Sequence, residues 1–201
     1  MKTSPAGIKL IARFEGFRAR PYKIGSDPWT IGYGETRGVG PNTPPVTERS
    51  ARQQLIKRVN RDFAPAVNAA AKRWNLRLNQ NQFDALVSFV YNLGTGVLTP
   101  GAPTGDSIRK ALAGGGKPAA VTAALALYVM PGTQFERGLR TRRAMEARLY
   151  TTPVEHPKLA GWRAELAALR ARFARDRDET RRAAIRKRIG ELKRAIKRKR
   201  V

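Results

Sequence analysis

The chain has 201 residues, 41% of them hydrophobic, which suffices for one ordinary domain with a core and a small appendage. Its 40 lysines and arginines outnumber 15 acids, and the net charge of +25 attracts polyanions such as nucleic acid, anionic lipid or an acidic cell wall. The absence of cysteine excludes disulfides, thiolate nucleophiles and cysteine zinc sites, and any Ser-His-Asp triad would need the single histidine, His156.

The N-terminal part predicts one helix followed by a small β lobe. Ser4 and Pro5 form an N-cap and a proline at the first helical position, and helical apolar spacing then continues until Gly16. Residues 17–46 are rich in glycine and proline, and within them WTIGYG at 29–34 alternates like a strand. We therefore expect a β lobe with many turns in this region.

Helical signals dominate the next hundred residues. Helical spacing resumes at Thr47 and is expected to end at Pro65, and a stripe beginning at Phe83 ends at Gly94, a typical C-cap. Further helices are predicted at 105–113, 117–129 and 135–149. This order predicts an α+β fold with a small β lobe and a helical lobe.

Charge divides the chain near residue 152. Residues 153–201 contain 17 basic and 6 acidic residues, a net charge of +11, which predicts a basic helical tail beyond a domain of residues 1–152. Two apolar stripes in the tail are out of phase, and the break falls where Asp176 or Asp178 could cap a second helix. Two amphipathic basic helices that form a hairpin fit this pattern.

Glu15 is the first candidate for chemistry, because catalysis is left to carboxylates, hydroxyls or lysines. It ends the first predicted helix, where the helix dipole disfavours an anion, and Phe14 and Phe17 could remove water from it. Both effects favour the protonated form, which suits a proton donor. The alternative is an exposed glutamate at a helix end, paired with Arg13 or Arg18.

The predicted strand offers a possible ligand surface beside Glu15. Period-two geometry places Thr30, Gly32 and Gly34 on one face, where one hydroxyl and two bare backbones would let a ligand lie close. The alternative is a hairpin whose glycines only serve its turns.

Three segments in order carry a family resemblance. They are FEG at 14–16 with Tyr22 and WTIGYG, LNQNQFDALVSFVYNLGTG at 78–96, and GLRTRRAMEARLY at 138–150. Over roughly residues 4–150 the chain resembles the phage-type lysozymes, the endolysins of glycoside hydrolase family 24. The resemblance implies a lysozyme-like α+β fold with a cleft between its lobes. It also implies a muramidase that cuts peptidoglycan between N-acetylmuramic acid and N-acetylglucosamine for host cell lysis.

The catalytic pattern of that family is a glutamate, an aspartate nine residues later and a threonine fifteen residues after the glutamate. Glu15 and Thr30 match this pattern, but the ninth position is Ile24, which cannot polarise a water molecule. Asp27 is the nearest acid and is our expected replacement. Glu35, at a position that is often histidine in the family, is a weaker alternative, and a site without a second carboxylate is another.

The resemblance implies an inverting hydrolase. Glu15 would protonate the leaving oxygen, while Asp27 and Thr30 orient water on the opposite face, with carboxylates about 6.5–9.5 Å apart. Without a second carboxylate, Thr30 alone could position the water, or the 6-hydroxyl of the sugar could attack, as in a lytic transglycosylase. A nonenzymatic protein that binds cell wall, membrane or another polyanion is the rival from a different class.

The remaining expectations concern binding. The resemblance places Thr36, Tyr91, Asn92 and Arg140 along the cleft as substrate-binding residues, although Asn92 could simply cap its helix and the arginines of 137–148 could be solvated. No metal or cofactor is expected, because cysteine is missing, histidine is single and carboxylates are sparse.

The tail lies outside the resemblance. Trp162 and Phe173 among dense arginines suit a helix on an anionic membrane, lipopolysaccharide or wall polymer. Docking on the body is an alternative, and nucleic acid is the least favoured partner. Since no signal peptide or membrane span is recognisable, we expect a monomer that stays in the host cytoplasm until a holin releases it to the cell wall.

Overall fold

The computed structural model describes residues 1–154 and 157–198, and the single histidine, His156, lies outside them. The chain divides into two compact units, Met1–Pro153 and Val154–Val201.

Helix α1 (Pro5–Glu15) begins and ends where the sequence predicts. The Ser4 hydroxyl accepts hydrogen bonds from the first free backbone N–H groups of the helix, and Gly16 follows its last residue. Ser4 also donates to the buried carboxylate of Asp84 on α4 (Gln80–Leu93), whose second oxygen accepts from the Ser4 N–H at 2.9 Å. This contact ties the start of α1 to the centre of the unit and so fixes where Glu15 lies.

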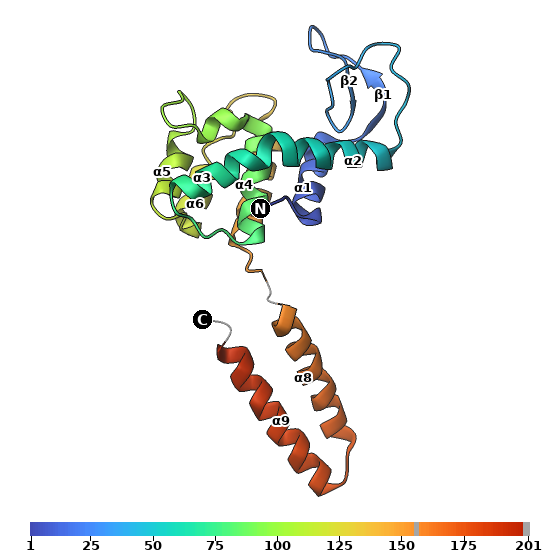
Figure 1. Ribbon diagram of the computed structural model, residues 1–201, viewed down its shortest axis with the longest axis vertical. Coiled ribbons are helices and arrows are strands. Elements are labelled where there is room, and N and C mark those ends of the chain that lie inside the picture. Colours follow the sequence, from blue (N-terminus) through green and yellow to red (C-terminus); the bar gives the residue numbers. More distant parts are fainter. Residues whose placement is uncertain (155–156, 199–201) are drawn as a thin grey trace. The chain divides into compact units, whose positions relative to one another are not determined.

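The β lobe is a two-stranded antiparallel sheet of β1 (Arg18–Tyr22) and β2 (Thr30–Gly32), beside α2 in Figure 1. Arg18 pairs with Gly32, and Tyr22 pairs with Thr30. The regular strand is shorter than the predicted stretch 29–34, because the backbone turns after Gly32.

The predicted open face of Thr30, Gly32 and Gly34 is wrong in one respect. Gly32 faces helix α2 (Glu48–Arg58), and a Cβ atom on it would lie only 3.0 Å from the Cβ of Ala51. Gly32 therefore serves close packing of the β lobe on α2. Gly34, with φ of +77°, turns toward a different set of side chains, described below.

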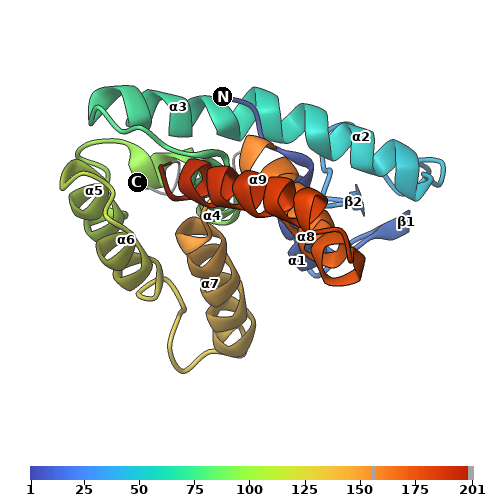
Figure 2. The same cartoon turned by 90° about the horizontal axis from the view of Figure 1, so that it is seen from below.

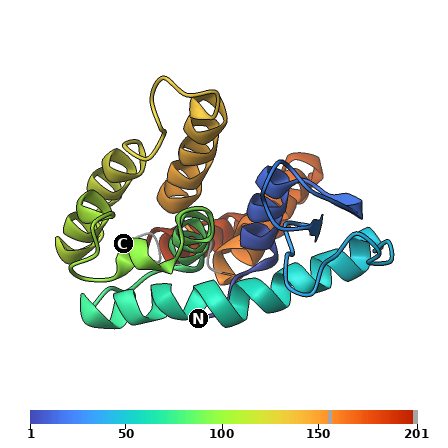
Figure 3. The ribbon, with the colours of Figure 1, turned by 90° about the horizontal axis from the view of Figure 1, so that it is seen from above.

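Helix α2 continues through a π-helical turn, η1 (Val59–Phe63), into α3 (Ala64–Arg73), and Figures 2 and 3 show this run crossing the unit. The predicted helix end at Pro65 is therefore wrong. Pro65 lies in the first turn of α3, where the missing N–H of proline costs little. The π-helical turn before it closes with a hydrogen bond from the N–H of Ala64 to the carbonyl oxygen of Val59, five residues back.

The helical lobe packs around α4, whose residues 83–90 are all buried. The predicted end of this helix at Gly94 is confirmed. The elements that follow are η2 (Thr95–Leu98), α5 (Asp106–Ala113), α6 (Pro118–Leu125) and α7 (Glu136–Thr151). Helix α6 ends four residues earlier than predicted. The unit has the α+β architecture predicted from the sequence, a small β lobe and a helical lobe.

The second unit contains α8 (Pro157–Arg175) and α9 (Glu179–Arg198), which pack against each other. The side chain of Asp178 accepts a hydrogen bond at 2.9 Å from the N–H of Arg181 and so caps α9. Among the described residues of the whole chain, no helix is both long and apolar enough to cross a membrane.

Candidate active site

Glu15 is held by one oxygen and open at the other. Its Oε1 accepts a hydrogen bond from Nη1 of Arg142 on α7 at 3.0 Å, and the side chain is 23% exposed. The partner is thus not Arg13 or Arg18, the local alternatives considered from the sequence. In the described part of the chain, Oε2 has no hydrogen bond. It faces Gly34, where a Cβ atom would lie 3.6 Å from it.

A buried network fixes Arg142. The carboxylate of Glu146 is fully buried and accepts from the Ser88 hydroxyl at 2.7 Å and from Arg142 Nε at 3.3 Å. Arg143 is 3.2 Å from its other oxygen. Burial raises the pKa of Glu146 and lowers the pKa of Arg143 to about 10. Because Glu146 and the carbonyl oxygen of Ser88 also accept hydrogen bonds from Arg142, its guanidinium group is a rigid donor to Glu15.

Two predicted cleft residues, Asn92 on α4 and Arg140 on α7, have different surroundings. Arg143 donates to the Asn92 side chain, so Asn92 is joined to the buried network. Arg140 is exposed and pairs with Glu136 at 2.6 Å. The predicted alternatives for the arginines of 137–148, substrate contact or solvation, both fail for the buried Arg142 and Arg143, which form ion pairs within the protein.

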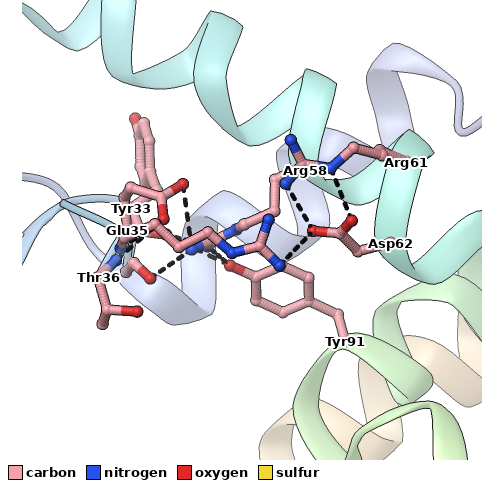
Figure 4. Close-up of polar contacts among 9 residues, drawn as sticks. Tyr33, Glu35, Thr36, Arg58, Arg61, Asp62 and Tyr91 are labelled. Carbon is pink, nitrogen blue, oxygen red and sulfur yellow. Dashed lines mark hydrogen bonds and ion pairs between the residues drawn. The ribbon is translucent and has the colours of Figure 1, made fainter. Parts of the chain in front are cut away.

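Arg58 organises the opposite side of the site (Figure 4). It ends α2, is largely buried, and donates to the carbonyl oxygens of Tyr33 and Gly34 and to the hydroxyl of Tyr91. Its guanidinium also lies 3.7 Å from Oε2 of Glu35. Burial lowers its pKa, against the opposing effect of the nearby carboxylates. Arg58 thus holds the turn after β2 against Tyr91.

Glu35 is engaged by its own turn. Its Oε1 accepts the backbone N–H groups of Thr36 and Arg37, both at 3.0 Å. The exposed Thr36 contributes its backbone to this arrangement. Nearby, Asp62 pairs with Arg61 at 2.7 Å. The two backbone hydrogen bonds and the ion pair with Arg58 leave the Glu35 carboxylate little freedom to orient a water molecule.

Asp27 and Thr30 lie on the hairpin between β1 and β2. The Thr30 hydroxyl donates to the carbonyl oxygen of Pro28 at 3.0 Å. Asp27 is exposed, and within the described residues its carboxylate has no hydrogen bond or ion pair. Ile24, at the expected position of the second acid, is 68% exposed. Among the described residues, no hydrogen bond or ion pair joins Asp27 or Thr30 to Glu15.

The structure therefore brings together only part of the predicted site. Glu15, Gly34 and Tyr91 converge, because a Cβ on Gly34 would lie 3.8 Å from the Tyr91 hydroxyl. Sequence reasoning missed Arg58 and the partners of Arg142. One signal was available: Glu146 is the only acid in the second half of α7 and lies four residues after Arg142, the spacing of helical ion pairs. No three acidic or histidine side chains among the described residues are placed to hold a metal ion.

A small β lobe, a helical lobe and a glutamate at the end of the first helix define a lysozyme-like α+β protein. The family described as phage lysozyme matches residues 12–146, and the chain belongs to this family. The predicted resemblance and fold class are thus confirmed.

Two solved structures agree with this assignment. The muramidase domain of SpmX from Asticaccaulis excentricus is 32% identical with a TM-score of 0.60, over 76% of this chain and 99% of that domain. The active form of the P1 phage endolysin Lyz is 29% identical with a TM-score of 0.62, over 78% of this chain and 89% of that protein.

Curated relatives are longer. The endolysin of Lactococcus phage c2 is 36% identical over 159 residues, 77% of this chain and 62% of that protein. The endolysin of Bacillus phage PZA is 35% identical over 157 residues, 76% of this chain and 56% of that protein. The chain therefore spans less than two thirds of the length of these relatives.

Proposed function

We propose that the chain is an endolysin, a muramidase that hydrolyses the glycan strand of bacterial peptidoglycan between N-acetylmuramic acid and N-acetylglucosamine. The observation that carries this proposal is the Glu15 carboxyl group, anchored through one oxygen and open at the other, in a member of the phage lysozyme family. The endolysin and muramidase names of the relatives support the same substrate.

Glu15 would act as the general acid. Its free oxygen, Oε2, lies on the side of Gly34 and would give its proton to the glycosidic oxygen of the leaving sugar. The carboxylate that remains would be stabilised by Arg142, already placed at 3.0 Å from Oε1. The turn held by Arg58 would border this reaction space.

Asp27 and Thr30 would orient the attacking water. The Asp27 carboxylate is free of protein partners in the described chain, so it can serve a water molecule or move with its loop. Attack from the face opposite Glu15 gives inversion, which needs carboxylates about 6.5–9.5 Å apart.

One observation favours a second candidate, a lytic transglycosylase acting on the same bond. Ile24 replaces the expected acid, and no hydrogen bond or ion pair among the described residues links Asp27 to Glu15. If Asp27 does not act, the 6-hydroxyl of the muramic acid can attack intramolecularly, which needs Glu15 but no carboxylate to activate water.

The test is mass spectrometry of the sugars released from purified peptidoglycan by wild type, Glu15→Gln and Asp27→Asn. We expect reducing-end muramic acid from wild type and a rate lower by about 10²–10⁴-fold for Glu15→Gln. Glu179→Gln, an exposed glutamate on α9, is the matched control and should act like wild type. Equal release by Glu15→Gln and wild type would refute the proposal. Anhydro-muramic ends would establish the transglycosylase.

The route to the wall is part of the same proposal. We propose that the protein acts as a monomer, waits in the host cytoplasm and reaches peptidoglycan after a holin opens the membrane. Expression in a bacterial host with and without a holin tests this route. Lysis that starts equally early without the holin would contradict it.

A further inference from the structure

The helical hairpin of the second unit is closed rather than open-faced. Leu159, Ile185 and Leu192 are buried, and α8 and α9 pack together. Phe173 lies under the guanidinium groups of Arg182 and Arg186, at 4.6 and 5.4 Å from the ring centroid. Among the described residues of α8 and α9, no large apolar side chain is exposed. The surface available to a partner is therefore polar and mostly basic.

A hollow lies at the end of the hairpin where the chain passes from α8 toward α9. Ala168, Ala171 and Asp176 belong to its lining. Four arginines complete its lining: Arg172, Arg175, Arg177 and Arg181. Positions 168, 171, 172 and 175 follow helical spacing, so small alanine side chains and long guanidinium arms share one face of α8. We call this feature the arginine hollow.

The arginine hollow has unbalanced positive charge. The Asp176 carboxylate accepts the Asp178 N–H at 3.0 Å, which holds its pKa low, and it pairs with Arg181 at 3.3 Å. The side chains of the other three arginines have no hydrogen bond or ion pair within the described chain, although the charge of Arg172 also helps to lower the pKa of Asp176. The hollow is thus lined by four arginines and by a single acidic side chain, Asp176, which is already paired with Arg181.

We propose that the arginine hollow binds the headgroup phosphates of an anionic phospholipid bilayer. Guanidinium groups bind phosphate oxygens through paired, charge-assisted hydrogen bonds. A hollow at one end of a hairpin fits phosphates presented singly on a plane, whereas a duplex nucleic acid is better matched by cations in a long row. The inference goes beyond the proposed function, and it does not depend on glycan cleavage.

The experiment measures sedimentation of the full chain with vesicles of equal parts phosphatidylglycerol and phosphatidylcholine. The test variant is Arg172→Gln/Arg175→Gln/Arg177→Gln. The control, Lys187→Gln/Lys193→Gln/Lys197→Gln, has the same net charge. Its substitutions lie 8–18 residues beyond the start of α9, about 12–27 Å along the helix and outside a Debye length of about 8 Å.

We expect the test variant to bind the vesicles about 100-fold more weakly than wild type, and the control to lose less than about tenfold. Equal losses in both variants would overturn the proposal, because binding would then follow net charge alone. Unchanged binding by the test variant would also overturn it. So would tighter, hollow-dependent binding to a DNA duplex at the same salt concentration.

A second variant guards against loss of the helical fold, which circular dichroism would reveal. Arg172→Lys/Arg175→Lys/Arg177→Lys keeps the charge and the helix but lacks the planar fork. We expect it to bind about tenfold more weakly than wild type. Binding as tight as wild type would refute recognition by guanidinium groups.

Discussion

The buried Glu146 gives the sharpest test of the network behind the active site. Glu146→Gln keeps the shape of the side chain and removes its charge. Arg142 would retain Glu15 as a counter-ion, but Arg143 would keep only uncharged described partners, the Asn92 amide and the Phe89 ring. Breaking a buried ion pair by removing one charge costs about 3–5 kcal/mol. In a chain of this size, that loss lowers the Tm by about 6–20 °C.

Thermal unfolding followed by near-ultraviolet circular dichroism measures this change. Glu191→Gln is the matched control, since its ion pair with Arg188 at 3.4 Å is half exposed, and it should cost less than about 1 kcal/mol. Glu146→Leu/Arg143→Met replaces both charges by apolar groups and should recover most of the loss. A Tm within about 2 °C of wild type for Glu146→Gln would refute the claim that this charge holds the network together.

Three further predictions concern single side chains. Gly34→Ala and Gly38→Ala both force positive φ and should cost about 1–2 kcal/mol each. Only Gly34→Ala places a methyl group near Oε2 of Glu15, so it alone should slow glycan cleavage, by up to about 100-fold. Arg58→Lys loses most of its hydrogen bonds and should lower both stability, by about 1.5–3 kcal/mol, and the cleavage rate; a rate unchanged by this substitution would contradict the role of the turn. Burial raises the pKa of Tyr150 to about 12, against about 10 in the unfolded chain. The unfolded chain therefore loses this proton first, so stability falls as pH rises from about 10 to 12, by up to about 3 kcal/mol. Tyr150→Phe should flatten that slope in urea titrations.

Local signals explain how much of the fold was predictable. Ser4, Pro5 and Gly16 mark the ends of α1 within a few residues, and Gly94 does the same for α4. Pro65 misled because the π-helical turn before it shifts the hydrogen bonds, so the proline falls at a helix start. No residue near Pro65 in the sequence reveals this shift.

The site was predictable in its acid but not in its partners. From the sequence alone, the expected partners of Glu15 are the arginines closest to it along the chain, Arg13 and Arg18. The observed partner is Arg142, 127 residues away, on a helix with five arginines. Which of those five are buried depends on the face of α7 that packs on α4. The tertiary packing of α7 on α4 determines that face, and the local sequence does not show it.

The division of the site into fixed and free parts bears on its chemistry. Glu15 is fixed by α7 through Arg142, and the turn that it faces is fixed by α2 through Arg58. The carboxylate of Asp27, unlike that of Glu15, has no hydrogen bond or ion pair among the described residues, although its backbone N–H donates to the carbonyl oxygen of Ile24. Proton donation needs a fixed group, because the leaving oxygen must meet it at hydrogen-bond distance. Orientation of water tolerates more movement, since the water itself adjusts. Loss of Asp27 should therefore cost less rate than loss of Glu15, and the reverse order would place the acid elsewhere.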